Sequence, residues 1–403
     1  MTETLTEIVI DNFSDARDAY RQKDLRQGLY DAGAVVMDGV LVNLHGDEHR
    51  LRRRLENRMF RRETFEHYER DLFPGVMEQT LVPHVAAGRT ELVHFGHELM
   101  LNLAAVTAGV DRPQGTRAET ERLHRYVGYF IEGATLAHST QDRAERTAVI
   151  AGQLRAWREE FLVPSIARRR SLLDAVTAGG AGEESLPRDV LTALLRHGDE
   201  LSLADDVMTR EVAFFLLAGA HTSATAFVRT IDHALSWVAE HPDDLDRLRE
   251  DRLFAQRCVH ETIRLNPSSP VGVRRALADI TLRSGVHIAE GSKVVIDLAK
   301  VNRDPAIFGD NADAFDPTRT MPDGIAPFGL SFAAGMHVCI GQDLAAGVVT
   351  NEDPGEGHLT GLVPVAVQRM FRAGARRDPE NPPERDKTTA RPYWSSYQVL
   401  LGA

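Results

Sequence analysis

Cysteine is almost absent from this chain of 403 residues, which contains only Cys258 and Cys339. Two thiols exclude both a framework of several disulfides and a cysteine-rich zinc site, and they favour a reducing, intracellular compartment. Long hydrophobic runs are also lacking, because the longest clearly apolar stretch, 212–220, is far shorter than the roughly 20 residues that a membrane helix needs. The first residues are acidic and lack the positive start of a signal peptide. We therefore expect a cytoplasmic protein with no membrane partner.

Excess positive charge and recognisable linkers are lacking too. The formal net charge is −12, from 47 basic and 59 acidic side chains, which argues against a nucleic-acid partner. No Pro-rich, Gly/Ser-rich or repeated stretch divides the chain, and its 43% hydrophobic and 26% charged residues are typical of folded globular proteins. We expect one domain over residues 1–403.

The spacing of apolar residues predicts a mainly α fold with small β-sheets. Several segments have helical periodicity: 92–106, 144–163, 190–195, 206–238 and 245–265. Between Pro267 and Val301 the apolar residues alternate or cluster between glycines, which indicates a small sheet region. Residues 302–327 then form a long irregular connection, and such loops in compact domains usually have a function.

The most informative segment surrounds Cys339 and contains Phe332, Gly335, His337 and Gly341. The two glycines allow the backbone to turn sharply and to approach a bulky planar group, while nearby backbone amides can donate to a sulfur. A helix that begins just after the cysteine would favour thiolate over thiol, and such a thiolate can be an axial haem ligand. The alternative is a buried structural thiol in a glycine-containing turn.

At these five positions the sequence resembles the cytochrome P450 family, whose cysteine loop has Phe, Gly, a basic residue, Cys and Gly at the same spacings. The resemblance implies that Cys339 is the proximal ligand of the iron of haem b and that His337 bonds a haem propionate. Ala333 stands where the family commonly has glycine, and Ala346 where arginine is common. Neither change removes the ligand.

Glu261 and Arg264 lie three residues apart on a predicted helix, so they can pair on one face. Such a pair is usually solvated at the surface. In the P450 resemblance, however, the same pair is buried and is completed by an arginine from the irregular loop, here Arg319.

Two further segments offer cations for haem propionates. His49 and Arg53 are four residues apart in a predicted helix, and Arg274 lies at the start of the sheet region, both places where the family has propionate ligands. For the other arginines of the stretch 50–62, a solvated basic face is the alternative. A basic patch near the cysteine would attract an acidic electron-transfer protein, so we expect a ferredoxin-type electron donor.

The predicted helix 206–238 contains the segment Ala218 to Ser223, which resembles the family's oxygen-side segment. The resemblance implies that Thr222 helps to deliver protons to bound dioxygen. His221 stands where the family usually has Asp or Glu, and it can relay a proton through a different network because histidine titrates near neutral pH. A threonine bonded to a helical carbonyl and a structural histidine are the alternatives.

The resemblance weakens at both ends of the chain. Only 48 residues precede His49, which predicts a reduced amino-terminal sheet and a more open substrate entrance. After Gly341, the segment 350–360 contains Pro354 and several glycines, which predicts a break in the helix that the family has there. Its acidic residues would disfavour a standard acidic ferredoxin.

As a whole, the resemblance implies a haem-thiolate monooxygenase that oxidises a small, largely apolar organic molecule with dioxygen. Apolar residues near the oxygen-side segment and the sheet are candidates for its pocket: Phe214, Phe215, Ala218, Val271 and Val273. Two alternatives remain, namely a peroxide-using or non-oxygenating haem enzyme and a non-catalytic binding scaffold of the same fold.

Overall fold

The computed structural model describes residues 6–138, 140–201, 203–350, 355, 357–387 and 393–402. The chain folds into two compact units. Unit 1 comprises Met1–Arg26, Phe65–Leu99 and Thr222–Ala403, and unit 2 comprises Gln27–Thr64 and Met100–His221. The expectation of a single haem domain stays a prediction.

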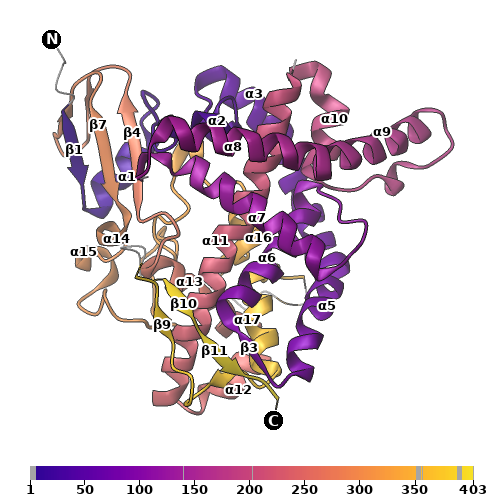
Figure 1. The fold of residues 1–403 in the computed structure, drawn as a ribbon. Coiled ribbons are helices and arrows are strands. Elements are labelled where there is room, and N and C mark those ends of the chain that lie inside the picture. Colours follow the sequence, from indigo (N-terminus) through magenta and orange to yellow (C-terminus); the bar gives the residue numbers. More distant parts are fainter. Residues whose placement is uncertain are drawn as a thin grey trace. The chain divides into compact units, whose positions relative to one another are not determined.

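Unit 1 contains a four-stranded sheet with the strand order β1-β7-β4-β2. Its strands are β1 (Glu7–Ile10), β2 (Leu25–Gln27), β4 (Val271–Ala276) and β7 (Lys293–Asp297). β1 is parallel to β7 and β4 is antiparallel to it, so that these three strands lie side by side (Figure 1). The amino-terminal segment supplies both edge strands. Among the described residues no strand pairs beyond either edge, and the reduction of this sheet relative to the family stays a prediction.

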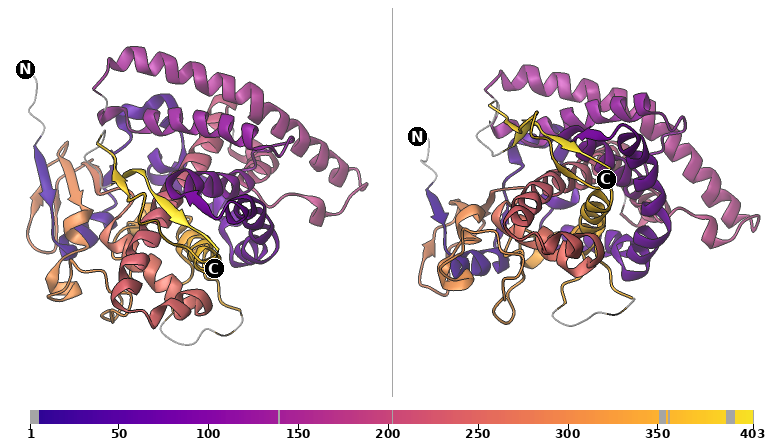
Figure 2. Two further views of the ribbon diagram at one scale, coloured as in Figure 1. Left: turned by 60° about the horizontal axis from the view of Figure 1, so that its bottom comes forward. Right: turned by 90° about the horizontal axis from the view of Figure 1, so that it is seen from below.

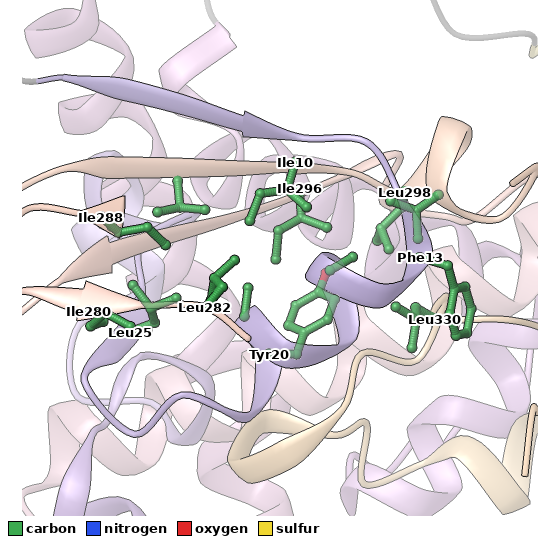
Figure 3. Packing of buried hydrophobic residues seen from close by; sticks show 14 of the residues in the cluster. Ile10, Phe13, Tyr20, Leu25, Ile280, Leu282, Ile288, Ile296, Leu298 and Leu330 are labelled. Carbon is green, nitrogen blue, oxygen red and sulfur yellow. The ribbon is translucent and has the colours of Figure 1, made fainter. Parts of the chain in front are cut away.

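Helix α1 (Phe13–Arg21) covers this sheet. It begins at Asn12, whose side chain accepts a hydrogen bond from the amide of Asp15 at 2.9 Å. Its buried residues recur every three or four positions, so that one face of the helix is apolar. Figure 3 shows Tyr20 of α1 facing Ile296 of the sheet, and Phe13 beside Leu298 and Leu330. This core fixes α1 against β4, which carries Arg274.

A second part of unit 1 is helical, with α12 (Asp244–Glu250) and α13 (Arg252–Leu265) packed against α17 (Leu362–Arg372) (Figure 2). The sequence predicted one helix over 245–265, but the chain breaks at Asp251. The carboxylate of Asp251 accepts hydrogen bonds from the amides of Leu253 at 2.9 Å and Phe254 at 3.2 Å, and thereby starts a new helix.

Apart from α5, the other elements of unit 1 are short. Its further strands are β3 (Arg89–Glu91), β5 (Ile280–Thr281), β6 (His287–Ile288), β8 (Arg376–Arg377), β9 (Glu384–Arg385), β10 (Trp394–Ser396) and β11 (Gln398–Leu400). Its further helices are α5 (Phe73–Ala86), α14 (Leu298–Val301), α15 (Pro305–Phe308) and α16 (Gln342–Ala346). Only α15 interrupts the connection 302–327 within that range, so the predicted irregular loop is confirmed.

Unit 2 is helical. It contains α2 (Ala34–Met37), α3 (Gly46–Glu56), α7 (Arg117–Ala134), α8 (Arg143–Trp157), α9 (Val163–Thr177) and α10 (Val190–Leu201). A π-helical stretch, Arg158–Leu162, joins α8 and α9 into one continuous helical rod (Figure 2). The wider turn lies directly before Pro164, which lacks an amide hydrogen and cannot continue the regular helical ladder.

Three helices have residues in both units: α4 (Arg62–His67), α6 (Leu92–Ala108) and α11 (Asp205–Glu240). α11 has 36 residues and runs without a break through Gly219. By length and composition alone it could cross a membrane, but 67% of its most apolar window is buried inside the protein. The helical pattern and small sheets confirm the predicted fold class.

Candidate functional site

The cysteine segment of unit 1 is a tight loop held by backbone hydrogen bonds. The amide of Cys339 donates to the carbonyl oxygen of Phe332 at 2.9 Å, and a 3-10 turn, Gly335–His337, lies between them. Cys339 is exposed, whereas Cys258 on α13 is buried. The alternative of a buried structural thiol therefore fits Cys258 and not Cys339.

The two glycines that flank Cys339 have different surroundings. Gly335 has a φ of +70°, and a Cβ there would overlap the carbonyl oxygen of Tyr20, so only glycine fits. At Gly341 a Cβ would meet no atom within 4 Å. The loop thus presents an exposed cysteine sulfur between two positions, Gly335 and Gly341, at which the backbone carries no side chain. This arrangement fits a flat, bulky group with a soft metal at its centre.

Ala333 has a φ of +60° and is the one described residue other than glycine in the left-handed region. This backbone conformation explains why glycine is common at that position in the family that the loop resembles. Since an L-residue pays about 1–2 kcal/mol for it, the loop keeps its shape here at a local cost in energy.

Arg274 and the cysteine segment share a neighbour, Tyr20 of α1. Arg274 is 3% exposed, its guanidinium lies 4.8 Å from the centre of the Tyr20 ring, and it donates to the carbonyl oxygen of Val273. A Cβ on Gly272 would overlap the Tyr20 hydroxyl. Tyr20 therefore positions both the strand that carries Arg274 and the turn at Gly335. Nothing in the sequence indicates this role beyond the apolar face of α1.

The predicted pair of Glu261 and Arg264 is buried and bidentate, with both hydrogen bonds at 2.7 Å. Arg319 donates to the same carboxylate at 3.1 Å, so its role as the third member is confirmed. Arg264 also donates to the carbonyl oxygens of Asn302 and Ala312 at 2.7 Å. The cluster therefore ties α13 to the irregular loop that leads to the cysteine segment.

His221 is the last residue of unit 2 and Thr222 is the first residue of the last segment of unit 1, on consecutive positions of α11. His221 is half-buried and Thr222 is exposed. The carbonyl oxygen of Thr222 accepts a hydrogen bond from the hydroxyl of Ser268 at 3.3 Å. Ser268 lies just before β4, so this bond links the oxygen-side segment to the strand that carries Arg274.

In unit 2, α3 carries His49 and Arg53 one turn apart. His49 is 2% exposed, and burial together with the charge of Arg53 lowers its pKa to about 4, so that its imidazole is neutral at neutral pH. Arg53 donates to the side chain of Asn57 at 3.0 Å. The structure therefore places two nitrogen-bearing side chains on one face of α3.

The arginine-rich stretch also contains a residue that the sequence analysis missed. Arg52 is 5% exposed and donates to the buried carboxylate of Glu211 on α11 at 2.7 Å, and the amide of Leu41 donates to the same carboxylate. Burial raises the pKa of Glu211, and burial with the nearby Glu211 charge raises that of Glu56. An acidic residue within an apolar helix, and a spacing of four between Arg52 and Glu56, were the available signals.

Comparison with known proteins gives the same picture as this geometry. The family model described as "Cytochrome P450" matches residues 149–347, which include the Glu261 pair and the cysteine segment. The chain belongs to the cytochrome P450 family. Proteins of this family are haem-thiolate enzymes with haem b as cofactor, and the exposed Cys339 sulfur with its glycines fits that group.

Among curated P450s, pulcherriminic acid synthase of Bacillus subtilis (strain 168) is 25% identical over 353 residues, which cover 85% of this chain and 80% of that protein. Linalool 8-monooxygenase of Pseudomonas putida is 32% identical over 160 residues, or 39% of this chain and 36% of that enzyme.

Solved structures show the same fold at low sequence identity. The crystal structure of CalO2 matches with a TM-score of 0.72 at 20% identity, covering 98% of this chain and 90% of that one. P450BioI, solved in complex with an acyl carrier protein ligated to hexadec-9Z-enoic acid, matches with a TM-score of 0.70 at 20% identity, covering 98% of this chain and 92% of that one.

Proposed function

We propose that this P450 is a monooxygenase that oxidises a small, largely apolar organic substrate with dioxygen and with electrons from a ferredoxin-type partner. The observation that carries the proposal is the exposed Cys339 sulfur in a loop closed by the bond from its own amide to Phe332. In this family the bound haem supplies the oxidative chemistry, while the protein supplies the ligand, a dry pocket and protons.

Each residue of the proposed site has a separate task. Cys339 holds the iron, and Phe332, Gly335 and Gly341 shape the loop around it. Four side chains are proposed to bind the propionates: His49, Arg53, Arg274 and His337. The support for Arg274 is its burial beside Tyr20, which also contacts the turn at Gly335.

Thr222 and His221 are proposed to deliver protons from α11. The support for this role is that an exposed threonine and a half-buried histidine occupy consecutive positions of α11, since a hydroxyl and an imidazole can each hold or pass on a proton. His221 in place of the usual acid leaves turnover intact and changes the route of the proton. If the variant His221→Asp left the coupling of electrons to product unchanged, this role of His221 would be wrong.

The decisive experiment compares the two cysteines. The purified protein is reduced and exposed to carbon monoxide, and its spectrum is recorded beside those of Cys339→Ala and Cys258→Ala. The strongly red-shifted Soret band of a thiolate-ligated haem is expected in the native protein and in Cys258→Ala, and its loss is expected in Cys339→Ala. A native protein without haem, or a red-shifted band that survives in Cys339→Ala, would overturn the assignment.

Two further measurements separate the alternatives. Turnover driven by peroxide without any reductase would identify a peroxide-using enzyme. A protein that binds haem but oxidises no substrate with either dioxygen or peroxide would instead be a binding scaffold.

A further inference from the structure

The helix that follows the cysteine segment is interrupted in an unusual way. α16 ends at Ala346 after five residues, and α17 begins at Leu362. The predicted break in this helix is confirmed, although Pro354 lies outside the described residues. The chain leaves at Gly347 and returns at Gly361, and a Cβ on Gly361 would overlap the backbone nitrogen of Gly347. The end of α16 and the start of α17 therefore meet.

Buried side chains from α13 hold this meeting point. Gln256 donates from Nε2 to the carbonyl oxygens of Ala346 at 3.0 Å and Val348 at 3.1 Å, and its Oε1 lies 2.9 Å from Nε2 of His358 in the returning loop. One turn later on α13, His260 Nε2 lies 2.8 Å from the same Ala346 oxygen. Gln256, His260 and His358 are 2%, 4% and 6% exposed. Water therefore cannot readily replace these bonds.

His260 is also connected to the other end of the cysteine segment, through Phe328. Its ring packs edge-to-face on Phe328, with centres 5.4 Å apart, and Phe328 packs in the same way on Phe332 at 4.8 Å. The carbonyl oxygen of Phe332 in turn accepts the amide of Cys339. A single side chain thus reaches the start of the segment through two aromatic contacts and its end through a hydrogen bond.

The protonation state of His260 suits this double contact. Burial lowers its pKa to about 4, so the imidazole is neutral at neutral pH. A neutral imidazole has one N–H, and the contact with the Ala346 carbonyl uses that hydrogen on Nε2. The ring face and edge remain available for Phe328.

We propose that His260 is a positioning residue for Cys339, which clamps both ends of the segment Phe332–Ala346 and replaces the support that an unbroken helix after Gly341 would give. Gln256 and His358 secure the broken helix end beside it. The proposal rests on the proposed function, because it assumes that Cys339 holds the iron. The clamp keeps the sulfur at a fixed place and thereby favours the thiolate-ligated state over one in which the sulfur is protonated or displaced.

Three substitutions at position 260 separate the two contacts. His260→Phe keeps the ring contact with Phe328 and loses the donor, His260→Gln keeps a donor and loses the ring, and His260→Leu loses both. The measured quantity is the ratio of the thiolate-type to the neutral-ligand Soret band of the reduced carbon monoxide complex, at a fixed urea concentration below unfolding. One hydrogen bond or one aromatic pair is worth about a fivefold change in this ratio, and the loss of both about 25-fold.

Tyr397→Phe is the matched control, because it removes one partly buried hydrogen bond of the same 2.8 Å length, from the hydroxyl of the buried Tyr397 to Asp232 on α11. We expect the ratio to fall in the Phe and Gln variants and to stay at the native value in Tyr397→Phe. This difference is expected even if the free energy of unfolding falls by the same amount in all three variants. If the ratio followed global stability alone, or did not change at position 260, the positioning role would be wrong.

The failure of the proposed function would look different. A native protein without the thiolate-type band would refute the ligation by Cys339, and the positioning role with it. A native band together with unchanged variants would refute only the positioning role. Because the Phe and Gln variants each keep one contact, the test does not depend on whether the Leu variant folds.

Discussion

Replacing Glu261 with glutamine removes the one negative charge that two buried guanidinium groups share. Its carboxylate accepts both bonds from Arg264, one from Arg319 and one from the amide of Asp316. Glutamine has nearly the same shape, but it offers one acceptor oxygen and turns an NH₂ group toward N–H donors. Arg264 is fully buried and Arg319 has a side chain 7% exposed, so water cannot replace the lost partner.

The expected loss in the free energy of unfolding is about 3–5 kcal/mol, as for other buried ion pairs that lose one member. Glu183→Gln is the matched control, since Glu183 and Arg196 also form a bidentate pair, at 2.6 and 2.7 Å, with side chains 60% and 46% exposed. There the same substitution is expected to cost about 0–1 kcal/mol.

Urea unfolding of the haem-containing protein, followed by far-UV circular dichroism, measures both variants under the same conditions. The unfolding transition of Glu261→Gln is expected at a clearly lower urea concentration than that of the native protein, and the transition of Glu183→Gln is expected close to that of the native protein. Equal small losses in the two variants would refute the reasoning, because they would mean that burial does not increase the cost of breaking this pair.

Three further predictions concern backbone strain and pH. Gly361→Ala is expected to lose at least about 2 kcal/mol of unfolding free energy, because φ is +90° and the new Cβ overlaps backbone atoms. In the control Gly324→Ala, φ is +73° but the new Cβ meets no atom within 4 Å, so only the conformational cost of about 1 kcal/mol is expected. Similar losses in the two variants would contradict the role of the backbone overlap. Ala333→Gly, at a φ of +60°, is expected to raise the urea midpoint or leave it unchanged, and a clear decrease would be the contrary result. Burial lowers the pKa of His233 and His260 to about 4, so the unfolded chain binds more protons below about pH 6.5, and stability is expected to fall between pH 6.5 and 4 by about 1.4 kcal/mol per pH unit for each histidine. In His233→Asn this slope, measured by urea unfolding across the pH range, should be smaller, and an unchanged slope would exclude His233 as a cause.

The sequence alone determined what depends on local spacing. The periodicity of apolar residues identified α6, α10 and α11, because a buried helix repeats its core side every three or four residues. The glycines around Cys339 identified the loop, since each marks a place where the backbone turns or must stay bare. The order of the Glu261 pair, the sheet region and the cysteine then sufficed to indicate the family.

Only the tertiary structure decided which groups far apart in the sequence come into contact and which are buried away from water. Apart from its spacing to Glu56, nothing in the arginine-rich stretch distinguishes Arg52 from the other arginines there. Only the fold buries Arg52 against Glu211, which is 159 residues away along the chain. Likewise, His260 meets the carbonyl oxygen of Ala346 across 86 residues, and only the fold brings them together. Short stretches of sequence determine local preferences for helix, strand or turn, whereas burial and long-range contacts arise from the packing of the whole chain. That packing determines the pKa of a buried group and which side chains support the cysteine segment.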